Sequence, residues 1–272
     1  MYETKAGTTE SGFDNARPEA PEQLRLLSEI LDADTFAVLE EAGVREGARC
    51  WDIGAGEGSV AVWLAERVGA TGSVLATDLK PDHVPVRPRL RALGHDVTAD
   101  PWPESEFDLI HARLVLMHLV DRHALAVRLA SHLRPGGALV LTDWYCDCAA
   151  GAVASPVDAP VWKIWQRYHD AVHDLGAKTG MSLEWAATAA DVLRAAGHQD
   201  VTVQRHRASG RGGGPTALLA RLHSFMLEPH LKAGAGLTDA DLAVIRENLL
   251  DPEFEMATYH TYTTVLRAPE TS

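Results

Sequence analysis

The amino-acid sequence predicts an α/β fold in which helices cover both faces of a mostly parallel sheet. One observation is that short apolar runs of strand length alternate with longer segments of helical spacing between residues 48 and 144. A second is that the first of these runs, ARCWDI, leads directly into a glycine-rich turn and a helical segment. Strands that alternate with helices form parallel sheets, because each helix returns the chain to the same edge.

The first half of the chain supplies most of this sheet. Residues 1–22 are polar, contain Pro18 and Pro21, and are expected to form a mobile N-terminal arm. Leucines at helical spacing predict a helix from residue 24, and a second helix is expected after Asp34. The strands expected next are 48–53, 73–79, 107–112 and 137–144, and the helices between them are 59–69, 88–94 and 114–137.

The alternation ends after Trp144. The elements expected beyond it are a helix rich in aromatic residues and histidine at 156–176, a helix at 181–197, a strand at 199–208, two helices ending at Leu250 and a closing strand at 257–269. The predicted division of the chain is therefore the arm at 1–22, a core at 23–149, a helical cap at 150–185 and the remainder of the core sheet at 186–272, with a helical insertion at about 215–250.

Composition restricts the class of ligand. The chain of 272 residues is 46% hydrophobic and 23% charged, as in ordinary globular proteins, and has a formal net charge of -13. We find no cluster of Lys and Arg, so nucleic acid is not expected as a partner. Three cysteines are too few for a disulfide framework, and no apolar run approaches the roughly 20 residues of a membrane span. We expect a cytoplasmic protein, without membrane association, that binds a small molecule; a homodimer stays open.

The most informative stretch is WDIGAGEGS. It places Gly54, Gly56 and Gly58 within five positions, two residues after Asp52. Because glycine loses more conformational entropy on folding than other residues, we expect a ligand to approach this backbone closely. A dinucleotide-binding turn has the spacing G-x-G-x-x-G, but residue 59 is Ser. The pattern is instead an acid followed by x-G-x-G-x-G.

This pattern resembles the first motif of class I S-adenosylmethionine-dependent methyltransferases. The similarity extends in order from about residue 45 to 145, through Asp78 in VLATDL, Asp96 in GHDVTADPWP, the block FDLIHARLVLMHL and RPGGALVLTDW. With the opening FDNARPEAPEQLRLL, the chain is similar to bacterial natural-product methyltransferases. Two departures lie near the adenine-binding loop: His95 replaces the usual Gly, and two extra residues precede Trp102. The resemblance implies a Rossmann-like, seven-stranded, mostly parallel sheet with one antiparallel strand and a helical cap.

The resemblance also implies which residues bind S-adenosylmethionine. Asp78 would accept hydrogen bonds from both ribose hydroxyls, Asp96 and the Val97 backbone would hold the adenine, and Asp52 would order the loop near the methionine ammonium. Each acid has a simpler alternative role as the cap of a turn. The expected cofactor-binding residues are Asp52, Gly54, Ala55, Gly56, Gly58, Asp78, Leu79, Asp96, Val97 and Arg113.

Catalytic residues are harder to assign, because methyl transfer from a sulfonium draws its driving force from the cofactor and needs mainly alignment. An acceptor hydroxyl or a protonated amine must also lose a proton, which calls for a general base. We consider His118, Asp143 and His173 as candidates. His118 corresponds to a histidine common in the family, although a packing role is an equal alternative. Structural hydrogen bonding is the alternative for Asp143.

The cap segment carries the candidate acceptor-binding residues. His169 and His173 share a helical face at a spacing that zinc sites also use, but no third ligand lies at a suitable spacing, so no metal is expected. Trp162 and Trp165 lie one helical step away and could stack on a flat acceptor. The expected substrate-binding residues are Trp144, Trp162, Trp165 and His169.

The function expected from these observations is methyl transfer from S-adenosylmethionine to a small molecule in secondary metabolism. Oxygen is the first choice of acceptor atom, followed by nitrogen and then carbon. Three alternatives stay open. They are a non-methylating reaction on the same fold, such as decarboxylation or hydroxylation, a nicotinamide oxidoreductase, which Ser59 disfavours, and a non-catalytic partner protein that retains the cofactor.

Overall fold

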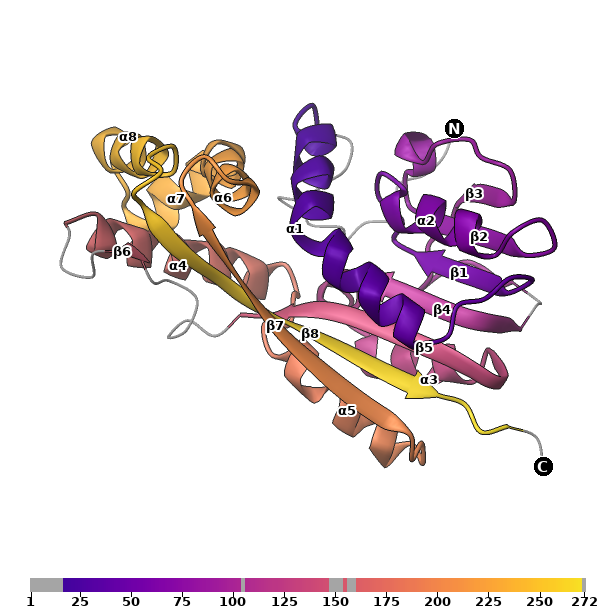
Figure 1. The fold of residues 1–272 in the computed structure, drawn as a ribbon. Coiled ribbons are helices and arrows are strands. Elements are labelled where there is room, and N and C mark those ends of the chain that lie inside the picture. Colours follow the sequence, from indigo (N-terminus) through magenta and orange to yellow (C-terminus); the bar gives the residue numbers. More distant parts are fainter. Residues whose placement is uncertain (1–16, 104–105, 147–153, 156–159, 271–272) are drawn as a thin grey trace, which may run out of the picture.

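The structure is a computed structural model that describes residues 17–103, 106–146, 154–155 and 160–270. Its centre is one sheet with the order β3-β2-β1-β4-β5-β8, and β7 pairs with the other side of β8 (Figure 1). The first five strands are parallel, whereas β8 runs antiparallel to both β5 and β7. The strands are β1 Arg49–Ile53, β2 Ser73–Asp78, β3 Leu90–Gly94, β4 Phe107–Arg113, β5 Leu133–Tyr145, β7 Val201–Arg211 and β8 Glu255–Arg267.

These seven strands confirm the predicted mostly parallel sheet with an antiparallel strand near the end of the chain. A further two-residue strand, β6 (Ala154–Ser155), pairs with the start of β8. The helices are α1 Ala20–Glu41, α2 Ser59–Arg67, α3 Arg122–Ala130, α4 Pro160–Lys178, α5 Trp185–Ala195, α6 Pro215–Met226, α7 Glu228–Ala235 and α8 Asp239–Asn248, with short 3-10 turns η1 Pro81–His83 and η2 Leu116–His118.

Helices cover the sheet on both faces, as predicted (Figure 1). Neighbouring residues of β1 point to opposite faces, so Cys50 packs in one core and Trp51 in the other. The core around Cys50 lies against α1 and α2, and includes Leu39 and Leu64. The core around Trp51 lies against α3 and α5, and includes Leu129 and Leu193. The sheet is therefore the middle layer of three.

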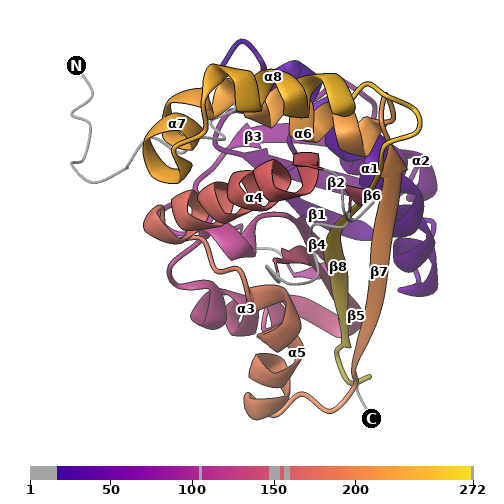
Figure 2. The ribbon, with the colours of Figure 1, turned by 90° about the vertical axis from the view of Figure 1, so that its left-hand side faces the viewer.

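A third core joins α4 with α6, α7 and α8. Trp165 of α4 packs there with Leu242 and Ile245 of α8 and with Phe254 just before β8. Figure 2 shows α4 lying alongside α7 and α8, although α7 begins about 50 residues and α8 about 60 residues after the end of α4. The segments predicted separately as a cap and an insertion thus form one helical layer. Of the predicted arm at 1–22, residues 1–16 lie outside the described part of the chain.

Several predicted elements were wrong. Residues 90–94 form strand β3 beside β2, not a helix. The helix expected at 114–137 is interrupted, because Leu114 has φ +54° and the chain turns through η2 before α3 begins. The two helices expected around Asp34 are one continuous helix, α1. Three helices rather than two fill 215–250, and Pro229 lies in the first turn of α7.

Candidate active site

The glycine-rich turn between β1 and α2 requires its glycines for conformational reasons. Gly54, Gly56 and Gly58 have φ values of +68°, +57° and +82°, in the left-handed region that side chains rarely adopt. Gly54 also has a close neighbour, since a Cβ there would lie 2.2 Å from Val115 Cγ2. Gly54 and Gly56 line a cavity together with Ala55, whereas Gly58 is buried as the N-cap of α2. The turn therefore places its backbone directly at the cavity wall.

Asp78 lies at the end of β2, beside this turn. Its Oδ2 accepts a hydrogen bond from the Gly56 N–H at 3.0 Å, and its Oδ1 accepts one from the Lys80 N–H at 2.9 Å. The residue is buried and lines the cavity together with Leu79. Because each carboxylate oxygen has two lone pairs, both oxygens retain the capacity to accept a hydrogen bond from a ligand. Asp78 thus links the glycine-rich turn to the cavity.

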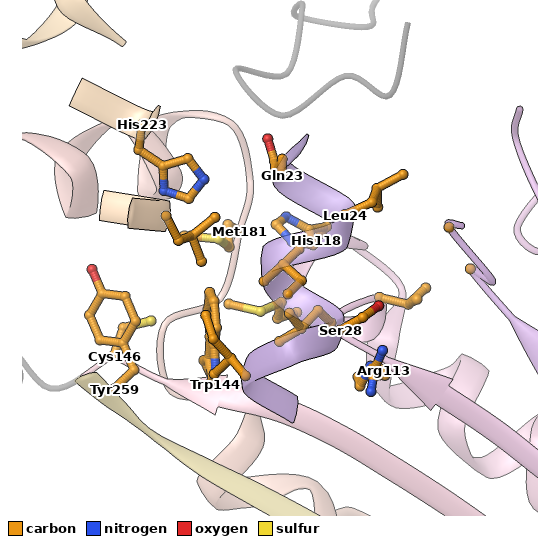
Figure 3. Close-up of a pocket in the computed structure, with 18 of the residues that line it drawn as sticks. Gln23, Leu24, Ser28, Arg113, His118, Trp144, Cys146, Met181, His223 and Tyr259 are labelled. Carbon is orange, nitrogen blue, oxygen red and sulfur yellow. The ribbon is translucent and has the colours of Figure 1, made fainter. Parts of the chain in front are cut away.

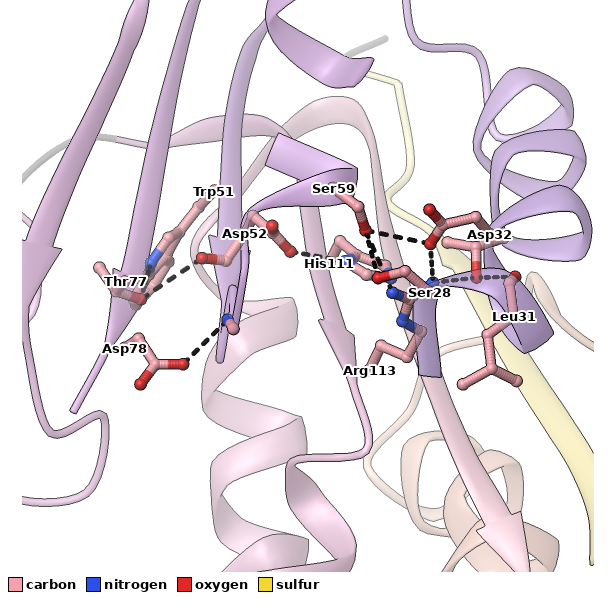
Figure 4. Close-up of polar contacts among 12 residues, drawn as sticks. Ser28, Leu31, Asp32, Trp51, Asp52, Ser59, Thr77, Asp78, His111 and Arg113 are labelled. Carbon is pink, nitrogen blue, oxygen red and sulfur yellow. Dashed lines mark hydrogen bonds and ion pairs between the residues drawn. The ribbon is translucent and has the colours of Figure 1, made fainter. Parts of the chain in front are cut away.

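Asp52 does not line the cavity. Its Oδ1 lies 2.7 Å from Nδ1 of His111, and the two residues are register partners on β1 and β4 (Figure 4). Both side chains are buried, and among the described residues no partner reaches Asp52 Oδ2 or His111 Nε2. Asp52 therefore supports the turn from behind. Sequence reasoning missed this pair, although both residues lie near the ends of predicted strands.

A second set of hydrogen-bonded polar side chains connects α1 to the sheet. Arg113 Nη1 donates to Asp32 Oδ1 at 2.8 Å and to Thr35 Oγ1 at 3.0 Å, and the Ser59 hydroxyl donates to the same Asp32 oxygen (Figure 4). Ser28 completes the group through its hydroxyl, 3.1 Å from Ser59 Oγ. Sequence reasoning missed Asp32, Thr35 and Ser28. The only signal was that these polar residues share one side of a long helix.

Asp96 and Val97 line the cavity beyond Asp78. Asp96 Oδ1 accepts from the Thr98 N–H at 2.8 Å and from its hydroxyl at 2.6 Å, so this acid caps its own turn. Val97 is buried, and its carbonyl accepts from Trp102 Nε1 at 2.8 Å. The departure from the family at His95 has a structural role, since His95 Nε2 donates to the Pro101 carbonyl at 3.2 Å. The loop is therefore fixed by its own contacts.

The cavity has a volume of about 400 Å³ and lies at the carboxyl ends of β1, β2, β4 and β5. Figure 3 shows Leu24, Ser28 and Arg113 on one side and Cys146, His223 and Tyr259 on the other. Its walls run from the glycine-rich turn and α1 to α4 and α6 of the helical layer. Of the residues proposed from the sequence for catalysis and acceptor binding, those that line it are His118, Trp144, His169 and His173.

The other three proposed residues do not line the cavity. Asp143 is buried behind η2, where it accepts from Trp185 Nε1 at 2.9 Å and from the Met117 N–H at 3.4 Å. Burial raises the pKa of Asp143 to about 7. Trp165 is fully buried, with its ring stacked on Tyr168 at 5.2 Å, and Trp162 packs against the same core. Asp143 thus supports the turn that carries His118, and the two tryptophans build the helical layer.

Two of the histidines that line the cavity, His118 and His169, have lowered pKa values. Desolvation by the surrounding protein lowers the pKa of His118 to about 4, and repulsion from the nearby Arg122 guanidinium acts in the same direction. The residue nevertheless lines the cavity and is accessible from it. Burial lowers the pKa of His169 to about 3, with His173 adding to the effect. Neutral imidazoles can each donate one hydrogen bond and accept one. No group of three or more metal-ligating side chains is arranged for a metal ion in the described part of the chain.

Comparison with known proteins places the chain in a family. Residues 25–203 match the family model described as "Methyltransferase domain", which covers more than half of the chain. Methyltransferase GfsG of Streptomyces halstedii is 32% identical over 133 residues, or 45% of this chain and 47% of GfsG. The ubiquinone/menaquinone biosynthesis C-methyltransferase UbiE of Laribacter hongkongensis is 32% identical over 114 residues, or 39% of this chain and 47% of UbiE. The matches thus span about half of each relative.

Solved structures share the fold. A putative methyltransferase from Bacillus halodurans has a TM-score of 0.56 and 14% identity, over 87% of this chain and 99% of that one. Phosphoethanolamine N-methyltransferase 2 of Haemonchus contortus, solved with S-adenosyl-L-methionine, has a TM-score of 0.56 and 15% identity, over 98% of this chain and 61% of that one. Among the described residues, no helix has the length and apolar character needed to span a membrane. The chain belongs to the methyltransferase-domain family and has the fold of the class I S-adenosylmethionine-dependent methyltransferases.

Proposed function

We propose that this chain transfers a methyl group from S-adenosylmethionine to a small-molecule acceptor. The observation that carries the proposal is the buried Asp78 carboxylate, which lines the cavity and is hydrogen bonded to the Gly56 N–H. A carboxylate held in this way suits a pair of ribose hydroxyls, because charge-assisted hydrogen bonds are strong where water is excluded. Family membership supports the same reading.

The residues around Asp78 fit the cofactor. A ligand in the cavity can approach the turn backbone closely at Gly54 and Gly56. Beyond Asp78 the cavity continues past Asp96. We propose that the cofactor contacts are Gly54, Ala55, Gly56, Asp78, Leu79, Asp96, Val97 and Arg113, with Asp52 and Gly58 supporting the turn from behind. When bound there, S-adenosylmethionine supplies a methyl group activated by its sulfonium.

We propose different roles for the three catalytic candidates. His118 lines the cavity on η2, so its imidazole is placed to accept a proton from an acceptor hydroxyl. Asp143 acts as a positioning residue, because it does not line the cavity and its oxygens accept from Trp185 Nε1 and from the Met117 N–H of the turn that carries His118. His173 lines the cavity farther along, on α4, and is the second candidate base.

The acceptor atom is proposed to be oxygen or nitrogen, with carbon less favoured, and the context to be secondary metabolism. The similarity of the sequence to bacterial natural-product methyltransferases and the largely apolar cavity lining support that context. Carbon stays in the proposal because one relative is named as a C-methyltransferase.

The test is a calorimetric titration of S-adenosylhomocysteine into the wild type and Asp78→Ala. Micromolar binding is expected for the wild type, and loss of the charge-assisted contact is expected to weaken binding by roughly 1–3 kcal/mol. Asp82→Ala is the matched control, because Asp82 is exposed and lies outside the cavity lining. If the folded wild type does not bind S-adenosylhomocysteine, the proposal is wrong. A protein that binds the cofactor but methylates nothing in a labelled-methyl acceptor screen would instead be a non-catalytic partner.

A further inference from the structure

The end of the cavity beneath the helical layer has its own chemistry. We call it the distal chamber and define it by the cavity-lining residues of the β5 end, α4, α6 and β8, together with Met181. Several of its walls appear in Figure 3, where Trp144, Met181, His223 and Tyr259 point toward one space. The chamber is the space left for the acceptor if the cofactor lies at the glycine-rich turn, so this inference rests on the proposed function.

Among the described residues, the charged side chains that line the cavity lie at its opposite end. The carboxylates that line it, Glu57, Asp78 and Asp96, belong to the glycine-rich turn, the end of β2 and the loop after β3. Arg113 lines it at the end of β4, and its guanidinium is held by Asp32. No Asp, Glu, Lys or Arg lines the distal chamber within the described ranges. An acceptor bound there meets none of these four charged side chains.

Two of the histidines that line the chamber, His169 and His223, do not supply a charge either. Burial lowers the pKa of His169 to about 3 and that of His223 to about 4, so both rings are neutral at pH 7. A phosphate, a carboxylate or an ammonium group would therefore be buried without a counter-ion, which is strongly unfavourable. The chamber selects against charged acceptors.

The chamber nevertheless offers a polar contact. His169 Nδ1 lies 3.2 Å from the Tyr259 hydroxyl, and the Tyr259 ring lies 5.7 Å from the Trp144 ring. The neighbouring Tyr168 hydroxyl donates to the Ala220 carbonyl at 3.0 Å. A phenolic oxygen can donate one hydrogen bond and accept two, so Tyr259 can serve His169 and a bound hydroxyl together. Trp144 and Tyr259 provide aromatic faces beside that contact.

We propose that the distal chamber binds an uncharged, flat acceptor that carries a hydroxyl group, which the Tyr259–His169 pair holds. The ring packs against Trp144 and the apolar walls, and the hydroxyl is oriented by the Tyr259 oxygen. Tyr259 and His169 are thus specificity-determining residues for the acceptor, and they would act on binding before any chemistry takes place.

The test uses four probes that share one ring system. They are 2-naphthol, naphthalene, 2-naphthoate and 2-(aminomethyl)naphthalene, each titrated by calorimetry into protein saturated with S-adenosylhomocysteine. Saturation is established first and separately, so a failure of the cofactor assignment is distinguishable from a failure of this proposal. We expect 2-naphthol to bind at least tenfold more tightly than 2-naphthoate or the ammonium probe. Equal or tighter binding of either charged probe, or no binding of 2-naphthol at millimolar concentration, would overturn the proposal.

Variants then locate the contact. Tyr259→Phe is expected to weaken 2-naphthol binding by about threefold to tenfold and to leave naphthalene binding unchanged, because one hydroxyl contact is lost. Tyr262→Phe is the matched control, since Tyr262 lies on the same strand outside the cavity lining. An equal loss for 2-naphthol and naphthalene in Tyr259→Phe would contradict the hydroxyl contact.

A charge introduced into the chamber gives an independent measurement. His223→Arg places a side chain that stays charged when buried on the α6 wall. We expect 2-naphthoate to gain at least tenfold in affinity over its wild-type value, with S-adenosylhomocysteine affinity unchanged. Retained cofactor affinity without that gain would show that the acceptor does not occupy this chamber.

Discussion

The Asp52 carboxylate and the His111 imidazole face each other across β1 and β4, with 2.7 Å between Oδ1 and Nδ1, and neither residue lines the cavity. Their side chains are only 3% and 1% exposed. Asp52 is followed directly by Ile53 and Gly54, both of which line the cavity. The pair therefore connects β4 to the glycine-rich turn, and the acid of the motif acts through the backbone that it supports.

Removing His111 is expected to destabilise the protein strongly. His111→Leu leaves a buried carboxylate without its partner, which costs about 3–5 kcal/mol in the free energy of unfolding. Urea denaturation measures this value, and His230→Leu on exposed α7 is the control. The double variant Asp52→Leu/His111→Leu should recover much of the loss, because no buried charge remains. A double variant no more stable than His111→Leu would argue against the pair as the cause.

Gly54→Ala is expected to disrupt the turn for two separable reasons. A left-handed conformation costs an alanine about 1–2 kcal/mol, and the new Cβ would collide with Val115. Gly197→Ala isolates the first effect, because Gly197 has φ +101° and no atom lies within 4 Å of the place that a Cβ would take. The midpoint temperature of thermal unfolding and the affinity for S-adenosylhomocysteine should both fall further for Gly54→Ala than for Gly197→Ala. Val115→Ala combined with Gly54→Ala should restore part of the difference.

Asp143 makes stability depend on pH. Burial raises the pKa of its carboxyl to about 7 in the folded protein, whereas an unfolded Asp titrates near 4. The folded state therefore binds more protons between about pH 4 and pH 7, so stability decreases as the pH rises through this window. Asp143→Asn cannot ionise and should show a flatter profile in urea denaturation at pH 5 and pH 8. Asp191→Asn, at an exposed position, should retain the wild-type slope.

The sequence was most informative where local spacing decides the structure. The turn at Gly54, Gly56 and Gly58 and the acid at Asp78 follow directly from a strand, a tight turn and a helix, all within 30 residues. The Asp52–His111 contact joins residues 59 positions apart, and it depends on the order of strands, which no local pattern encodes. Global strand order became predictable only through family resemblance.

The helical layer shows a second limit of sequence reasoning. Spacing correctly indicated one helix carrying Trp165 and His169, but both residues are buried and only His169 lines the cavity. Trp165 is covered by Leu242, Ile245 and Phe254, which lie more than 70 residues later in the sequence.

The helix predicted at 114–137 was wrong for a related reason. Its apolar spacing suits a helix, but the end of β4 sets Leu114 in a left-handed conformation and the chain turns there.

Arg113 links the position of α1 to cofactor binding. Its guanidinium donates to Asp32 and Thr35 of α1 and also lines the cavity. Arg113→Gln should weaken S-adenosylhomocysteine binding by about tenfold and speed amide hydrogen exchange in α1, because Asp32 loses a charged partner that is largely shielded from water. Arg45→Gln, which removes an exposed ion pair with Asp108, should change neither quantity. Weaker binding with unchanged exchange in α1 would mean that Arg113 contacts the cofactor directly and does not act by holding the helix. Faster exchange with unchanged binding would separate α1 from the cofactor site altogether.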